Sequence, residues 1–191
     1  MDSEQSSLVQ AFTQKAEAVS AQVFWVSDIH QALHQVVQSC VHKQACTPLA
    51  TGCEENLSAA ATDLCTLKEW SKIMAVPGLG TRDVDILVPE CQKQSIKLIQ
   101  EGLRQHLGGI DIGLTWAEYG IAETGTVVLD STLEDIRLAS MISEIPSVLL
   151  PASGLVPDTS ALNQILGASF HNQPNYTSFI TGPSRTADIE R

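Results

Sequence analysis

Short apolar runs of strand character alternate along the chain with segments whose apolar residues recur every three or four positions. The strand-like runs lie at residues 23–26, 72–76, 110–114, 126–129, 147–150 and 177–180. Parallel neighbours need a long crossover connection, usually a helix, so this alternation is typical of a parallel sheet with helices between its strands. The sequence therefore predicts an α/β fold with a mainly parallel sheet.

The amphipathic segments predict helices over residues 8–19, 29–41, 54–70, 131–141 and 158–166. Asp28 precedes the second of these as an N-cap, and Ser131 with Glu134 has the spacing of a capping box. Pro89 suits the first turn of a further helix, whose stripe would be Ile96, Ile99 and Leu103. We expect residues 1–22 to form an N-terminal helix and residues 23–191 one α/β domain.

The charge of the chain excludes several classes of partner. The chain has 22 acidic and 11 basic residues, which gives a formal net charge of −11. This charge is spread evenly along the sequence. The absence of a basic segment argues against nucleic-acid binding. No apolar run approaches the ~18 residues of a membrane helix, and residues 1–4 lack the pattern of a signal peptide. We expect a soluble, cytoplasmic protein without membrane insertion.

Five cysteines, at positions 40, 46, 53, 65 and 91, contain no C-x2-C pair. Compact zinc and iron–sulfur sites usually take two ligands from one such tight turn. The spacing therefore favours scattered core cysteines or free thiols, with no metal site and no cofactor on this chain. His30 and His34 are four residues apart on a predicted helix, but they flank its apolar stripe and indicate a solvated face.

Two polar segments beside predicted strands are the candidate ligand sites, since ligands of parallel α/β sheets bind beyond the carboxyl ends of strands. The first, residues 118–126, contains Glu123, followed by Thr124, Gly125 and Thr126 as ligand-contact candidates. Glu123 has the chemistry of a base, a nucleophile or a hydrogen-bond acceptor, and equally that of an exposed acid at a turn. A third segment, residues 77–85, lacks the third glycine and the lysine of phosphate-binding loops.

The second candidate segment, residues 181–190, has the components of an anion site. Its candidate contacts are a glycine for close approach, hydroxyl groups, an arginine fork and two acids: Gly182, Ser184, Arg185, Thr186, Asp188 and Glu190. The structural alternative is a Gly-Pro turn followed by a helix that Ser184 caps. In that alternative Arg185 pairs with one of the two acids on an exposed turn.

Residues 120–129 (Gly-Ile-Ala-Glu-Thr-Gly-Thr-Val-Val-Leu) and 180–190 (Ile-Thr-Gly-Pro-Ser-Arg-Thr-Ala-Asp-Ile-Glu) together resemble the LUD-domain family, of the lactate utilization protein C type. The resemblance is strong over residues 116–190 and looser over 1–110. It implies a fold similar to that of the NagB/RpiA/CoA-transferase superfamily, an open, mainly parallel sheet with helices on both faces.

The same resemblance implies a function in an iron–sulfur-dependent L-lactate utilization system, which oxidises L-lactate to pyruvate. This chain would be an accessory or ligand-binding subunit for a small anionic or phosphorylated ligand, with the iron–sulfur clusters on partner subunits. Whether it catalyses a step itself is left open. The alternative is a stand-alone isomerase or acyl/CoA-transferase-like enzyme, with Glu123 as nucleophile by fold-level analogy.

Family members usually continue past the motif at residues 187–190 into a final apolar strand, whereas this sequence stops at Arg191. Either the gene model is truncated or the sheet lacks its last strand. In the second case the neighbouring strand would have an open edge, which favours self-association.

Overall fold

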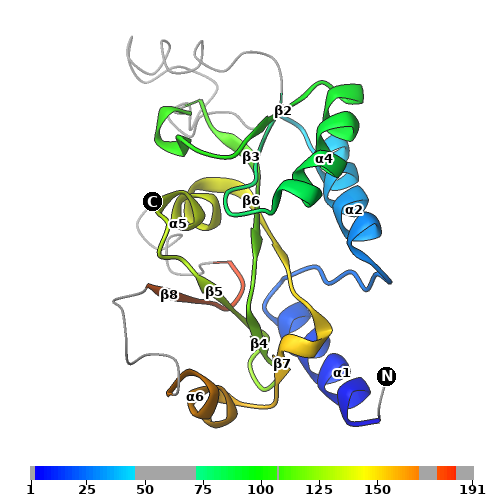
Figure 1. The fold of residues 1–191 in the computed structure, drawn as a ribbon. Helices are drawn as coiled ribbons and strands as arrows, with labels where there is room; N and C mark the ends of the chain where they lie inside the picture. Colours follow the sequence, from blue (N-terminus) through cyan, green and yellow to red (C-terminus); the bar gives the residue numbers. More distant parts are fainter. Residues whose placement is uncertain (1–2, 46–71, 107, 168–175, 184–191) are drawn as a thin grey trace, which may run out of the picture. The chain divides into compact units, whose positions relative to one another are not determined.

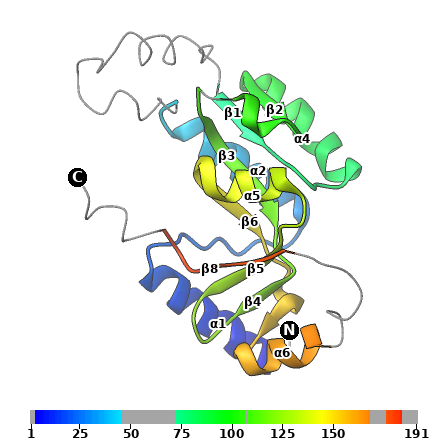
Figure 2. The ribbon, with the colours of Figure 1, turned by 90° about the vertical axis from the view of Figure 1, so that its left-hand side faces the viewer.

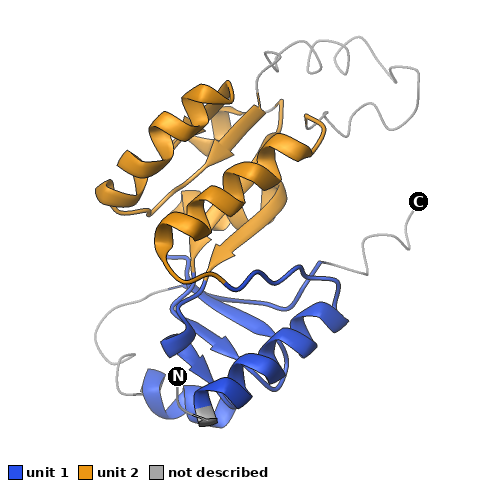
Figure 3. Ribbon diagram, turned by 90° about the vertical axis from the view of Figure 1, so that its right-hand side faces the viewer, with its two compact units in different colours: residues 1–25, 117–132, 150–191 blue, residues 26–116, 133–149 orange. Residues whose placement is uncertain are grey.

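The computed structural model describes residues 3–45, 72–106, 108–167 and 176–183. These residues divide between two compact units (Figure 3). Unit 1 comprises residues 1–25, 117–132 and 150–191, and unit 2 comprises residues 26–116 and 133–149. The chain thus passes between the units four times. The predicted division into residues 1–22 and 23–191 stays a prediction.

Unit 2 contains a four-stranded sheet in which every pair of neighbours is parallel (Figure 1). Its order is β2-β1-β3-β6, with β1 at Lys72–Ala75, β2 at Ile96–Ile99, β3 at Ile110–Trp116 and β6 at Ser143–Leu149. Met74 lies opposite Ile112, and Ile112 lies opposite Ile145. The predicted α/β fold with a mainly parallel sheet is confirmed.

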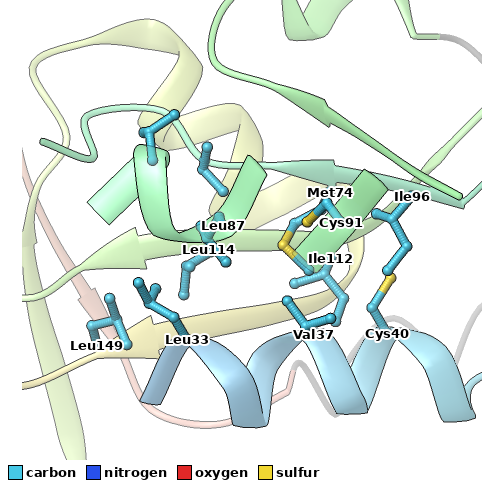
Figure 4. Close-up of a cluster of buried hydrophobic side chains, with 12 residues drawn as sticks. Leu33, Val37, Cys40, Met74, Leu87, Cys91, Ile96, Ile112, Leu114 and Leu149 are labelled. Carbon is cyan, nitrogen blue, oxygen red and sulfur yellow. The ribbon is translucent and has the colours of Figure 1, made fainter. Parts of the chain in front are cut away.

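Helices cover this sheet on both faces. Figure 4 shows Leu33 and Val37 of α2 (Ile29–His42) and Leu87 of α4 (Thr81–Lys93) packed with side chains of the central strands. A second core cluster joins Ala139 of α5 (Glu134–Ile142) to Ile73 and Ala75 of β1. The predicted N-cap of α2 is confirmed, because Asp28 accepts a hydrogen bond from the backbone N–H of Gln31 at 2.9 Å. A 3-10 turn, η2 (Leu103–Gln105), precedes β3.

Unit 1 contains a separate mixed sheet of order β7-β4-β5-β8 (Figure 2). Its strands are β4 (Tyr119–Ile121), β5 (Thr126–Asp130), β7 (Leu155–Val156) and β8 (Thr177–Ile180). β5 is antiparallel to β4 and β8, and β7 is parallel to β4. β8 is the last strand in the order of the described sheet, and the open edge and the self-association expected from the sequence both stay predictions.

Two helices pack against the strands of unit 1 and form its core with them. α1 (Ser3–Ala18) packs Phe12 and Ala16 against Ala122 and Leu155. α6 (Thr159–Gly167) packs Leu162 against Ile121, Val128 and Val156, and η3 (Ala152–Gly154) precedes β7. The predicted N-terminal helix is confirmed as α1. No helix in the described ranges is long and apolar enough to cross a membrane.

The predicted strand at residues 23–26 is wrong. The segment has no strand partner in the described part of the chain, and Phe24 and Trp25 are about half exposed. It lies where the chain passes from unit 1 to unit 2. A short apolar run becomes a strand only where a neighbour can accept its backbone hydrogen bonds.

The predicted helix that starts at Pro89 is also wrong. Pro89 lies inside α4, and Ser95 adopts a left-handed φ of 54° just after this helix. Ile96 and Ile99 belong to β2 and contribute to core clusters on opposite faces of the sheet. Their spacing of three imitates a helical stripe, because strands of a parallel sheet are apolar on both faces.

The capping box predicted from Ser131 and Glu134 does not form. The Ser131 hydroxyl bonds the carbonyl of Tyr176 and the hydroxyl of Ser178, and α5 begins at Glu134 without a side-chain cap. Cross-strand contacts in unit 1 thus take the place of the local cap. The helix predicted over residues 54–70 lies outside the described residues.

Candidate functional site

The two candidate segments meet at one edge of the mixed sheet in unit 1. β4 and β8 are both antiparallel to β5, so they run in the same direction and their carboxyl ends lie beside the start of β5. The hairpin turn at residues 122–125 and the segment at 181–183 therefore come together, although 55 positions separate Thr126 from Thr181. β7 runs parallel to β4 and ends at this edge too. Strand ends therefore converge here in a mixed sheet, whereas the sequence analysis assumed the carboxyl ends of a parallel sheet.

Three threonine hydroxyls join the two segments. Thr126 Oγ1 lies 2.7 Å from Thr124 Oγ1 and 2.6 Å from Thr181 Oγ1, and in each pair either oxygen can donate. Thr126 is buried, whereas Thr124 and Thr181 are exposed. We refer to Thr124, Thr126 and Thr181 as the threonine row. The row includes two predicted contacts and Thr181, the first residue of the second segment.

Packing against α1 explains why glycine occupies the two predicted contact positions 125 and 182. Gly125 and Gly182 both have a φ of +69°, a conformation that residues with a side chain rarely adopt. A Cβ on Gly125 would lie 2.4 Å from the backbone nitrogen of Ala16, and one on Gly182 would lie 2.6 Å from the carbonyl oxygen of Val19. Both segments thus pack backbone to backbone against the C-terminal end of α1 and the residue next to it.

Glu123 occupies the exposed tip of the hairpin turn. Its backbone N–H donates to the Pro157 carbonyl at 3.0 Å, and the Gly125 N–H closes the turn onto the Ile121 carbonyl at 2.9 Å. The backbone is therefore fixed while the carboxylate faces solvent. This position suits a ligand-contacting acid and a turn acid alike, so its catalytic role stays a prediction.

The remaining predicted contacts, Ser184, Arg185, Thr186, Asp188 and Glu190, lie outside the described residues. Their participation in an anion site stays a prediction. The described part of the second segment is Thr181, Gly182 and Pro183, and of these Thr181 and Gly182 contact the residues around the hairpin turn and α1.

A carboxylate that the sequence analysis did not assign to the site lies on the connection from β7, which ends at this edge. Asp158 Oδ1 accepts a hydrogen bond of 2.8 Å from the backbone N–H of Ala161, in the first turn of α6. An Asp before a helix at this spacing is a recognisable N-cap. Since Asp158 satisfies one of the free N–H groups of α6 and carries a negative charge, it disfavours an anion at that helix end.

A second polar cluster, which the sequence analysis also missed, lies in unit 2. Lys43 Nζ lies 2.8 Å from Asp111 Oδ1 and 2.8 Å from Glu144 Oε2, and Asp111 is fully buried. Burial by itself lowers the pKa of Lys43, but the hydrogen bonds to the two carboxylates outweigh it and leave the pKa raised. Asp111 stands between two isoleucines in a strand, and a charge in such a place was the available signal.

The two described cysteines lie in one core cluster of unit 2. Cys40 and Cys91 are buried in the core between α2 and α4, and the other three cysteines lie outside the described residues. No group of three His, Cys, Asp or Glu side chains that could hold a metal occurs among the residues described. His34 pairs with Glu90 across α2 and α4 at 3.2 Å on an exposed surface.

Comparison with known proteins relates nearly the whole chain to one family. The family model described as "LUD domain" matches residues 9–191. Lactate utilization protein C of Halalkalibacterium halodurans is 42% identical over 83 residues, and that of Bacillus subtilis is 35% identical over 83 residues. The uncharacterized protein YkgG of Escherichia coli is 37% identical over 82 residues. These matches cover 41–42% of this chain and only 35–36% of each relative. No solved structure matches significantly.

Proposed function

The chain belongs to the LUD domain family, as its two motifs predicted, and from this membership we propose that it serves lactate utilization by binding a small carboxylate or phosphorylated ligand. The names of its relatives, lactate utilization protein C, support the process. The proposed place of binding is the edge of the mixed sheet where residues 122–126 meet residues 181–183.

The observation that carries the binding proposal is the hydrogen bond between Thr126 and Thr181. It joins the two segments whose sequences define the family resemblance, and it puts their hydroxyl groups at an edge where three strands end. Hydroxyl groups and backbone N–H groups at strand ends are usual contacts for carboxylates and phosphates. In this proposal Arg185, Ser184 and Thr186 add anion contacts from the following residues.

We further propose that the protein works in the cytoplasm as an accessory, ligand-binding subunit. The partners would be the iron–sulfur subunits of an L-lactate oxidation system, which accept the electrons when L-lactate becomes pyruvate. This assignment is supported by the family resemblance. A pull-down of the tagged full chain from cells grown on L-lactate should recover proteins that contain iron–sulfur clusters.

The binding proposal is tested by calorimetry with L-lactate, pyruvate, inorganic phosphate and coenzyme A. Changing Arg185 to Lys keeps the charge but loses the bidentate fork, so affinity for the bound anion should fall. Changing Arg185 to Ala should weaken binding further, by about 1.5–3 kcal/mol. Arg104→Ala is the matched control, because Arg104 is an exposed arginine paired with Glu134 in unit 2.

If Arg185 only pairs with a neighbouring acid, its change to Ala should leave binding intact and alter stability by about 0–1 kcal/mol. A wild-type protein that binds none of the four ligands would refute the ligand-binding role.

The alternative, an isomerase or acyl/CoA-transferase-like enzyme, is favoured by one feature: Glu123 is exposed at the same edge as the threonine row. A nucleophilic Glu123 would form an acyl-glutamate with an acyl-CoA and release free coenzyme A. Mass spectrometry of the intact protein after incubation with acetyl-CoA should then show an added acetyl group that Glu123→Gln abolishes. An unmodified protein would favour the accessory role.

A further inference from the structure

The hydrogens of the threonine row can be counted. Three hydroxyl groups carry three hydrogens, and the bonds Thr124–Thr126 and Thr126–Thr181 use two of them. One hydroxyl hydrogen therefore remains for another partner. Among the residues that the structure describes, no further hydrogen bond is formed by these three hydroxyls.

Burial decides where the remaining hydrogen points. Thr126 is only 5% exposed, so a hydrogen left on its hydroxyl would be largely withdrawn from solvent without a partner. Thr126 instead donates to one neighbour and accepts from the other. The remaining hydrogen then belongs to Thr124 or to Thr181, both of which are exposed.

The two exposed ends of the row consequently differ at any moment. One end has a free O–H and donates, while the other end has already given its hydrogen to Thr126 and can only accept. The row can reverse when all its hydrogens shift together, but it keeps one donor and one acceptor in both directions.

We infer that the threonine row is a specificity element for carboxylates that carry a hydroxyl group at the α-carbon. Such a ligand offers a carboxylate oxygen to the donor end and its own hydroxyl hydrogen to the acceptor end. A 2-oxo acid has no hydrogen to give, and an unsubstituted carboxylate lacks the second group altogether. This inference rests on the proposed binding function and names the feature by which the site selects its ligand.

A purely structural role of the row is the competing explanation, because cross-strand Thr–Thr bonds also stabilise sheets. The same pair of strands provides a matched control at its other end. There Ser178 of β8 bonds the hydroxyl of Ser131, which follows β5, at 2.7 Å. Ser178→Ala removes a cross-strand hydroxyl bond without touching the threonine row.

The experiment is a ligand-observed NMR titration of the full chain with L-lactate, pyruvate and propionate. The wild type should bind L-lactate about three- to tenfold more tightly than the other two, the usual effect of one net hydrogen bond. In Thr126→Val the hydroxyls of Thr124 and Thr181 no longer share a hydrogen-bonded neighbour, so each can donate or accept. The variant should therefore bind L-lactate and pyruvate with about equal affinity. Thr126→Ser and Ser178→Ala should keep the preference.

The possible outcomes distinguish failure of the specificity inference from failure of the proposed ligand-binding function. Equal affinity of the wild type for L-lactate and pyruvate, or an unchanged preference in Thr126→Val, would overturn the inference while leaving the binding function in place. Absence of binding by all three carboxylates would overturn the inference and restrict the proposed binding function to phosphorylated ligands, which the calorimetry tests. Thr181→Val, at an exposed position, provides a second test of the preference if Thr126→Val does not fold.

Discussion

The ammonium group of Lys43 lies 2.8 Å from the carboxylate of Asp111, a side chain with no solvent exposure. The second oxygen of Asp111 accepts the backbone N–H of Ile73 at 2.8 Å, so both carboxylate oxygens have partners. Lys43 follows α2, and Asp111 lies in β3. This ion pair therefore ties the end of a helix to the amino-terminal end of the parallel sheet.

Changing Lys43 to Met should destabilise unit 2 by about 3–5 kcal/mol, because it leaves the buried charge of Asp111 without its cation. Urea unfolding of wild type and variant at pH 7 measures this difference. Arg104→Met is the control, since the Arg104–Glu134 pair is exposed and its loss should change stability little. Equal losses of unfolding free energy in both variants would mean that the Lys43–Asp111 pair stabilises the protein no more than an exposed ion pair does.

The same ion pair predicts a loss of stability at alkaline pH. The pKa of Lys43 is raised above its ordinary value of 10.5 in the folded state. The contribution of Lys43 to stability is therefore complete below pH 10.5 and is lost as the pH rises through the folded-state pKa. Unfolding free energies between pH 9 and 12 should decline more steeply for wild type than for Lys43→Met, and parallel declines would contradict the assignment.

Cys91 should react slowly with thiol reagents in the native protein. Burial raises the pKa of its thiol to about 11, so the reactive thiolate is scarce at neutral pH, and the side chain is 1% exposed. Pulse alkylation followed by peptide mass mapping should leave Cys91 unlabelled until urea unfolds the chain. Labelling in the native state at the rate of a thiol in unfolded peptide would show that the face of α4 that carries Cys91 is not packed against α2 and the sheet.

Most elements of the fold could be predicted because each carries its signal locally. The stripe Leu33, Val37 and Cys40 and the cap at Asp28 determine α2, and the apolar runs determine β1, β3, β5 and β8. The errors arose where partners distant in sequence decide. Residues 23–26 have strand-like composition but no neighbour in the described part, and Ser131 bonds β8 instead of capping α5.

The sequence predicted the two segments of the candidate site but not the contact between them. Glycines and hydroxyl residues marked both segments in the sequence, whereas the bond from Thr126 to Thr181 depends on the pairing of β5 with β8. β4 was missed because Tyr119–Ile121 is three residues long and includes a glycine. A Cβ on Gly120 would lie 2.6 Å from a Leu150 methyl group and 3.1 Å from the Phe12 ring, so these side chains would have to shift to admit a larger residue.

Protein purified without oxygen should contain no stoichiometric iron or zinc. The five cysteines are at least six residues apart, so no tight turn supplies two thiolate ligands. Elemental analysis by mass spectrometry checks this expectation. Iron near one atom or more per chain that disappears when Cys46 or Cys53 is changed to Ser would contradict it.

Gly125 of the hairpin turn should tolerate alanine less well than Gly102 of unit 2, and comparing the two separates backbone conformation from steric overlap. Gly102 also has a positive φ, 72°, but its added Cβ would meet only the flexible end of Gln105 at 3.6 Å, so Gly102→Ala should cost about 1–2 kcal/mol from conformation alone. Gly125→Ala adds an overlap with the Ala16 backbone at 2.4 Å and should cost about 2–5 kcal/mol. Thermal unfolding followed by circular dichroism measures both variants against wild type. If Gly125→Ala is no less stable than Gly102→Ala, the hairpin turn does not pack against α1 as the structure describes.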